Sequence, residues 1–234
     1  MARHLIAALS ALALAPQIAG AFEITGANIG LNYSTFAEHG MRDTNKASLN
    51  GSLEAGFGPN FSIQTDIGAH QFGILDDSGQ NFALHGIYHM SNGASVGAFA
   101  GRDWLAGQNL DLWGLEARNT FGMFDVEGNL TFIDGDNGRG NAVGLRSDYA
   151  FSNQLSLGGR FDYVDDGSET LTRVGALADF VPQDGMVISG EVGAADLPDD
   201  NVEPYVGLGL KMTFGGNRGT TFGSRGLQDI LPGY

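Results

Sequence analysis

Short segments in which apolar and polar residues alternate recur along most of this chain, and this two-residue period constrains the fold more than any other feature. In one of the first, Ile29 and Leu31 alternate with Gly30 and Asn32. Successive side chains of a β-strand point to opposite faces, so each such segment predicts a strand with one apolar and one polar face. We count about twelve such strands, within a range of roughly ten to fourteen, and only the segment from Ala94 to Trp104 is ambiguous.

The connections between these segments alternate in kind. The even-numbered connections are tight and consist mostly of turn residues. They are Gly58-Pro59-Asn60, Ser91-Asn92-Gly93, Gly122-Met123, Ser152-Asn153 and Pro182-Gln183-Asp184-Gly185. The odd-numbered connections are predicted to be longer or more acidic, and they cover 36–45, 76–79, 134–140, 165–168 and 195–201, with 106–108 as a short exception. A bacterial up-and-down barrel alternates short periplasmic turns with longer extracellular loops in this way.

A soluble β-sandwich or a solenoid would also show alternation, so the choice between them and a membrane barrel needs a second observation. Charged residues occupy the polar face of most strands, and aromatic residues lie near strand ends on the apolar face. The aromatic residues are Phe57, Phe61, Tyr88, Tyr149, Phe151, Tyr163 and Phe180. A lipid-facing band carries aromatic girdles at both membrane interfaces. We therefore predict an all-β fold, a transmembrane antiparallel up-and-down β-barrel over residues 22–214.

Residues 1–21 are interpreted as a cleavable signal peptide. Arg3 and His4 form a short basic start, Leu5 to Ala15 is an apolar core, and Ala19-Gly20-Ala21 supplies small residues for cleavage before Phe22. The apolar core is shorter than the roughly 18 to 20 residues that a spanning helix requires. The interpretation predicts export, and any membrane insertion would use strands.

Composition excludes several other classes. Glycine accounts for 37 of 234 residues, more than twice the usual share of about 7%, but without the period of collagen. The chain has no cysteine, which excludes disulfides and thiolate metal sites. A net charge of −15 argues against nucleic acid as a partner, because phosphates require clustered Lys and Arg. No Pro/Ser-rich linker divides the chain, so a single domain is expected.

With these features the chain resembles the bacterial outer-membrane β-barrel, porin-like proteins. Its segment from Tyr205 to Phe214 looks like the carboxy-terminal insertion signal of that group. The resemblance implies the cell outer membrane as location, with membrane lipids and the barrel-assembly machinery as partners. One departure is the Gly-rich tail 215–234, which follows the terminal aromatic and is expected to be a plug, a periplasmic extension or a flexible end.

The leading functional expectation is a passive diffusion channel for small hydrophilic solutes, with no cofactor. A barrel of about twelve strands lies between those filled by side chains and those with a wide channel. Inward glycines such as Gly144 and Gly175 favour an open lumen or relieve crowding in the curved wall. The candidate lumen and selectivity residues are Glu116, Arg118, Glu127, Arg146, Asp148, Arg160, Asp162, Arg173 and Lys211. Oligomeric state stays open.

The alternative is a closed structural or adhesive barrel that acts through its acidic loops, which could bind divalent cations weakly. Those loops contain Asp76, Asp77, Asp134, Asp136, Asp165, Asp166, Asp199 and Asp200.

An outer-membrane enzyme is the third hypothesis, and we expect the chain not to be one. If a tight hairpin forms around Asp77-Ser78, His70 falls opposite His85 and Asp66 opposite His89, which would gather three imidazoles and a carboxylate. These four residues are weak candidates for a metal or a general base, and polar filling of the lumen is preferred.

Overall fold

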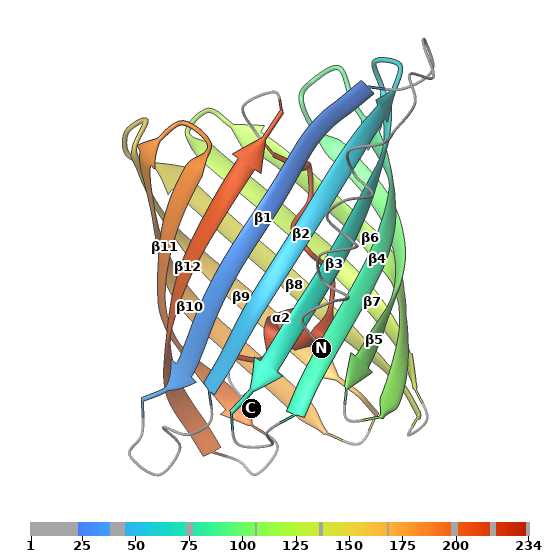
Figure 1. The fold of residues 1–234 in the computed structure, drawn as a ribbon, viewed down its shortest axis with the longest axis vertical. Helices are drawn as coiled ribbons and strands as arrows, with labels where there is room; N and C mark the ends of the chain where they lie inside the picture. Colours follow the sequence, from blue (N-terminus) through green and yellow to red (C-terminus); the bar gives the residue numbers. More distant parts are fainter. Residues whose placement is uncertain are drawn as a thin grey trace, which may run out of the picture.

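The computed structural model describes residues 23–37, 45–73, 77–105, 107–135, 138–167, 169–197, 201–215 and 219–232. It is a closed barrel of twelve antiparallel strands with one short helix in the lower half of its interior (Figure 1). The elements are β1 (Glu23–Phe36), β2 (Asn45–Phe57), β3 (Phe61–Phe72), β4 (Asp77–His89), β5 (Ser95–Leu105), β6 (Gln108–Phe121), β7 (Phe124–Gly135), β8 (Gly138–Ala150), β9 (Leu155–Asp165), β10 (Thr170–Gln183), β11 (Met186–Leu197), β12 (Asn201–Phe214) and α2 (Leu227–Ile230). The predicted signal peptide lies outside the described residues.

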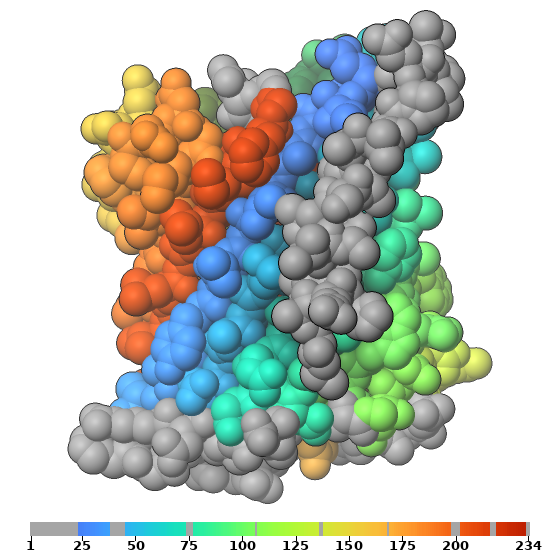
Figure 2. Space-filling view, viewed as in Figure 1, coloured from blue at the N-terminus to red at the C-terminus, as the bar shows by residue number. Residues whose placement is uncertain are grey.

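Each strand pairs with its neighbours in the sequence, and β1 pairs with β12 to close the barrel. This seam runs from Ala27 opposite Phe214 to Phe36 opposite Tyr205, and Figure 2 shows the two strands side by side along the wall. Closure leaves the sheet with no unpaired edge strand. The predicted all-β up-and-down barrel of about twelve strands is confirmed.

The outer face of the wall is apolar and exposed. Leu31, Ile67, Leu115, Val192 and Leu208 lie on five different strands, and each is more than half exposed. An apolar surface that surrounds the whole barrel exceeds what a protein in water tolerates, so this belt faces hydrocarbon. None of the helices in the described residues has the length and apolar character to span a bilayer.

Aromatic side chains border this belt. Near the tight turns, the ring of Phe61 lies 5.0 Å from that of Tyr88, and the ring of Phe124 lies 4.8 Å from that of Tyr149. Trp113 stacks on Phe132 at 4.2 Å, closer to the opposite ends of β6 and β7. Rings with an apolar body and a polar tip are suited to the two interfaces of a membrane.

The tight turns that the sequence predicts all join strands at one end of the barrel, which we call the short-turn end; it is at the top of Figure 1. The opposite, acidic end carries Asp134, Asp165 and Asp166. Asp76, Asp136, Asp199 and Asp200 lie outside the described residues. Both chain ends of the barrel, Glu23 and Phe214, are at the short-turn end.

Two predicted connections at the acidic end are wrong in extent. Strand pairing between β7 and β8 continues through Asp134 opposite Arg139 to Gly135 opposite Gly138, so 134–140 is mostly strand. β4 already begins at Asp77, which makes residues 77–79 of the predicted turn part of the sheet. Glycine and aspartate read as loop residues, but backbone hydrogen bonds to a neighbouring strand outweigh their weak strand preference here.

The ambiguous segment forms β5, and Phe99 is the cause of the ambiguity. Its side chain points inward, is buried, and lies with its ring 5.6 Å from that of His85. Gly114 on β6 faces it, and a Cβ atom at Gly114 would lie 2.7 Å from the Phe99 ring. The large inward ring of Phe99 is therefore accommodated by a glycine, Gly114, on the neighbouring strand.

This match predicts that Gly114→Ala destabilises the barrel by about 1–3 kcal/mol, the usual cost of overpacking, because the new methyl group would also lie 2.2 Å from the Leu130 carbonyl oxygen. Gly30→Ala is the matched control, since its nearest neighbour would be 3.8 Å away. Urea unfolding of the lipid-inserted protein, followed by heat-dependent gel mobility, measures both variants. Equal midpoints for the two would contradict this packing.

Candidate functional site

The barrel interior has two halves of different character. The inner wall of β2 to β6 is covered by the C-terminal tail, residues 219–232, which follows β12 and lies inside the barrel. Beside the tail, a cavity of about 640 Å³ remains, and the inward side chains of β7 to β12 make up much of its wall. This cavity is the candidate path for a solute.

Arginines of β8 and β9 face the cavity next to carboxylates. Arg146 lies between Asp148 and Asp179, with a nitrogen–oxygen distance of 2.7 Å to each. Arg160, directly opposite Arg146 in the strand register, contacts Glu191 at 3.2 Å. The guanidinium groups are thus held by a carboxylate of the same strand, Asp148, and by carboxylates two strands away, Asp179 and Glu191.

Two further cations differ in their pairing. Arg173 on β10 is buried and lies 2.7 Å from Asp162 on β9. Lys211 on β12 lines the cavity and is exposed, and in the part of the chain described here it forms no ion pair. Lys211 therefore presents its charge to the cavity with no carboxylate of the described residues at ion-pair distance.

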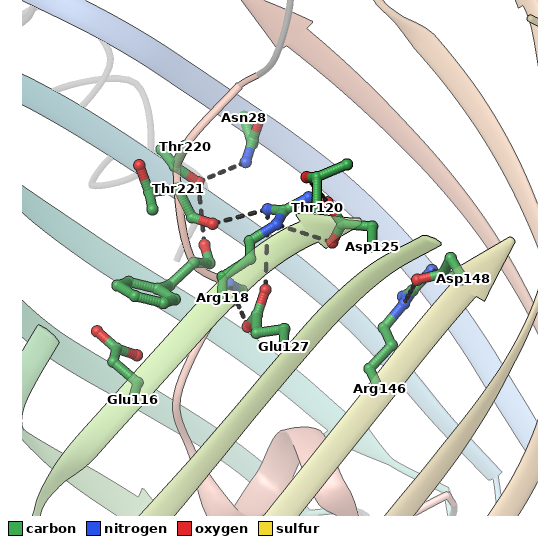
Figure 3. A network of polar contacts seen from close by, with 12 residues as sticks. Asn28, Glu116, Arg118, Thr120, Asp125, Glu127, Arg146, Asp148, Thr220 and Thr221 are labelled. Carbon is green, nitrogen blue, oxygen red and sulfur yellow. Dashed lines mark hydrogen bonds and ion pairs between the residues drawn. The ribbon is translucent and has the colours of Figure 1, made fainter. Parts of the chain in front are cut away.

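The remaining candidates, Arg118, Glu116 and Glu127, contact the tail (Figure 3). Arg118 donates a hydrogen bond of 2.7 Å to the Thr221 carbonyl and one of 2.9 Å to Asp125. Arg225 of the tail lies 2.9 Å from Glu116 and 2.6 Å from Glu127. Eight of the nine predicted lumen residues line the cavity, and Glu116 is buried beneath Arg225.

Burial opposes the charge of Arg225, but Glu127 and Glu116 outweigh it and raise the pKa of its guanidinium above the ordinary value. The group therefore keeps its charge inside the barrel. Both carboxylates of this contact are largely or wholly buried, so loss of the arginine would leave Glu116 with His85 alone and Glu127 with the more distant Arg118.

Inward glycines make room for neighbouring side chains more than for a channel. A Cβ atom at Gly144 would lie 2.4 Å from the Asn129 side chain, and one at Gly158 would lie 2.3 Å from Asp148. One at Gly175 would lie 2.6 Å from Glu191. Of the two interpretations of these glycines, the distances support relief of crowding at the three positions, because polar side chains already occupy the adjacent space.

The register predicted for the histidines is wrong. Because β4 begins at Asp77, His70 pairs with Gly79 and Asp66 with Ala83. Even so, His85 contacts two carboxylates, Asp66 through Nε2 at 2.9 Å and Glu116 through Nδ1 at 2.7 Å. An imidazole can donate from both nitrogens only when doubly protonated, so this geometry describes a buried cation between two anions.

The other histidines lie apart from His85. His70 Nδ1 is 2.8 Å from the Ser48 hydroxyl, whereas His89 contacts Ser62 and Ser95 at 2.8 and 3.0 Å. Within the described ranges, no group of three or more His, Cys, Asp or Glu side chains is arranged to hold a metal ion. Of the four candidate ligands, Asp66 and His85 thus contact each other, whereas His70 and His89 are engaged in separate hydrogen bonds.

Sequence analysis missed an apolar lining at the acidic end. Phe36, Leu171, Ala195, Leu197 and Tyr205 form one buried cluster inside the barrel. A second cluster consists of Leu112, Ile133 and Ala142. The alternation itself contained the signal, because Leu112 and Ile133 share the inward face of their strands with Glu116 and Glu127.

The cavity extends along the length of the barrel. Gly122 and Met123, the turn between β6 and β7, line it at the short-turn end. Toward the acidic end its lining includes Leu112, Tyr205 and Ile230, together with Ser34 and Lys46. The interior is therefore a vestibule that reaches the short-turn end and becomes more apolar where the tail meets the two clusters.

Solved structures with this fold include porins and a channel. The chain is 15% identical to the KdgM porin in complex with disordered oligogalacturonate, with a TM-score of 0.63 over 80% of this chain and 99% of that chain. An outer membrane channel from Pseudomonas putida F1 is 11% identical, with a TM-score of 0.56 and coverage of 86% and 100%. The NanC porin is 7% identical, with a TM-score of 0.57 and coverage of 80% and 98%. At these identities the likeness establishes a shared fold.

No protein-family model matches the chain, and no curated protein sequence matches it.

The contacts of His85 predict that His85→Ala lowers the free energy of unfolding by about 3–5 kcal/mol, because buried Asp66 and Glu116 would lose their shared counter-charge. His89→Ala is the control, since that side chain is 30% exposed and lies 3.5 Å from a single carboxylate, Glu54, so its loss should cost less. Urea unfolding in lipid vesicles compares them. A His85→Ala variant as stable as the control would contradict the imidazolium assignment.

Proposed function

We propose that the chain is an outer-membrane channel through which small hydrophilic solutes diffuse passively. The observation that carries the proposal is the cavity of about 640 Å³, which is lined by charged side chains and enclosed by a lipid-facing barrel. Rings of charged and polar side chains are how channels replace the hydration of a passing solute.

The comparisons support the same function without establishing it. Proteins of similar fold are named as porins or channels, and one was solved with oligogalacturonate. A saccharide of small size is therefore a reasonable first solute to test. The predicted signal peptide at residues 1–21 supports export, and the apolar belt supports contact with outer-membrane lipids after insertion by the assembly machinery.

Selectivity is assigned to the charges that face the cavity. Most arginines there are paired with carboxylates, so their fields partly cancel at the distance of a passing ion. Lys211 has no such partner among the described residues and is exposed. We expect it to contribute more to selectivity than the paired arginines do.

A closed structural or adhesive barrel is the second candidate. The tail within the lumen and the apolar clusters at the acidic end favour it. An enzymatic role has less support, because the polar groups that could act as acids or bases are mostly engaged with one another inside the wall.

Single-channel recording separates these candidates. The mature full chain and a form ending at Phe214 are inserted into planar bilayers, and insertion is verified by protease protection. Conducting steps from either form support a channel. Silence from both inserted forms would support the closed structural barrel instead.

For the conducting form, we predict that Lys211→Glu shifts ion selectivity toward cations, because it replaces an exposed positive charge with a negative one. Lys211→Arg keeps the charge and should leave selectivity unchanged. The reversal potential under a salt gradient measures the effect. An unchanged potential in Lys211→Glu would remove this residue from the conducting path.

A further inference from the structure

The C-terminal tail occupies the lumen along a defined course. It leaves β12 at the short-turn end, passes over β1, and reaches α2 in the lower half of the barrel in Figure 1. Asn28 of β1 donates a hydrogen bond of 2.7 Å to Thr220 near its start. Ser34, also on β1 but nearer the acidic end, donates one to the Pro232 carbonyl near its finish. The tail therefore runs lengthwise through the barrel.

The first part of the tail, residues 220–225, is bound by polar side chains of the wall. The Thr221 amide donates to Glu54 at 2.6 Å. Gln64, fully buried, accepts from the Phe222 amide at 3.1 Å and donates to the Phe222 carbonyl at 2.9 Å, as a neighbouring strand would. With Arg225 on Glu116, these contacts hold the backbone as well as the side chains. We call residues 220–225 the anchor.

Glycines of the wall are placed where the tail approaches most closely. A Cβ atom at Gly26 would lie 1.9 Å from the Gly219 carbonyl oxygen, and one at Gly79 would lie 1.7 Å from the Gln228 side chain. One at Gly97 would lie 2.9 Å from the Phe222 ring. The absence of side chains at these three positions is what admits the tail. The wall is thus shaped for this segment.

The last part of the tail, residues 227–232, packs against the apolar clusters at the acidic end. Ile230 and Leu231 contact the cluster of Phe36 and Leu171. Leu227 and Ile230 also contact the cluster of Leu112 and Ile133. We call residues 227–232 the stopper, because their apolar side chains fill the space between the two clusters at this end of the barrel.

Polar contacts fix the orientation of the stopper. Asp103 accepts from the Leu227 amide at 2.7 Å, and Asp229 accepts from Asn50 at 3.1 Å and from Asn81 at 3.0 Å. Lys46 donates to the Gln228 carbonyl at 2.5 Å. Each apolar side chain of the stopper is therefore held in one position by its own backbone or its neighbours.

We infer that the inner wall of β2 to β6 is a binding site for an extended peptide, and that its resident ligand is the chain's own C-terminal tail, whose stopper closes the channel at the acidic end. The inference deepens the proposed function and rests on it. Since the tail starts at the short-turn end, the channel opens when the stopper withdraws toward that end, while the anchor sets how readily it returns.

The first test keeps the full chain. The double variant Ile230→Asp/Leu231→Asp places carboxylates against the two apolar clusters and is expected to give conducting steps where the unaltered chain gives none. Ile230→Val/Leu231→Met keeps the stopper apolar and should stay closed. Heat-dependent gel mobility verifies that each variant is a folded barrel. Steady conductance of the unaltered chain, equal to that of the double Asp variant, would overturn the inference.

The second test supplies the ligand separately. The form ending at Phe214 should conduct, and a synthetic peptide of residues 219–234 should close it when added on the short-turn side and not on the other. A peptide with Phe222→Ala and Arg225→Ala, which lacks two anchor contacts, should close it only at a higher concentration.

The outcomes separate this inference from the proposed function. Conduction that the peptide does not block, in a folded truncated barrel, would overturn the binding site and leave the channel. Silence of every inserted form, including the double Asp variant, would overturn the channel itself.

Discussion

The pairing of every wall strand with two neighbours is the constraint on which the rest of this structure depends. In hydrocarbon, an unpaired backbone amide or carbonyl costs several kcal/mol, so a strand protein must close on itself. β1 and β12 meet this demand through the seam that starts at Ala27 and Phe214. Once the wall is closed, the two-residue period directs every second side chain into the interior of the barrel. Closure therefore encloses the polar face of every strand.

Closure creates a second problem, because the interior side chains lose access to bulk water. Buried polar groups are costly without partners, and the inner wall of β2 to β6 carries the carboxylates of Glu54, Asp66, Asp103 and Glu116. His85 neutralises part of this charge. The tail supplies most of the remaining donors through Arg225 and its own amides. The tail is thus an integral part of the polar interior, although it lies outside the sheet.

The sequence predicted the strands of the barrel wall much better than the arrangement of the segments inside the barrel. Strand number and tight turns follow from local period and turn residues, and each can be recognised within a few positions. The prediction of the β3–β4 register failed because Asp77 and Ser78 look like a turn but are paired with Phe72 and Gln71 in the sheet. The inward charges were found from alternation alone. The course of the tail could not be found in this way, because it has no period and its partners, such as Glu54 and Gln64, lie more than 100 positions away in the chain.

The placement of the tail across the seam bears on how the barrel is assembled. Pairing of β1 with β12 joins residues at opposite ends of the chain, and such distant contacts carry the largest entropy cost and form late. The tail continues from β12, crosses β1 at Gly26 and Asn28, and binds β2 and β3 at Glu54 and Gln64. It therefore connects β12 to β1, β2 and β3 from inside the barrel, across the β1–β12 seam. The segment that follows β12 thus also holds together the junction that is expected to form last.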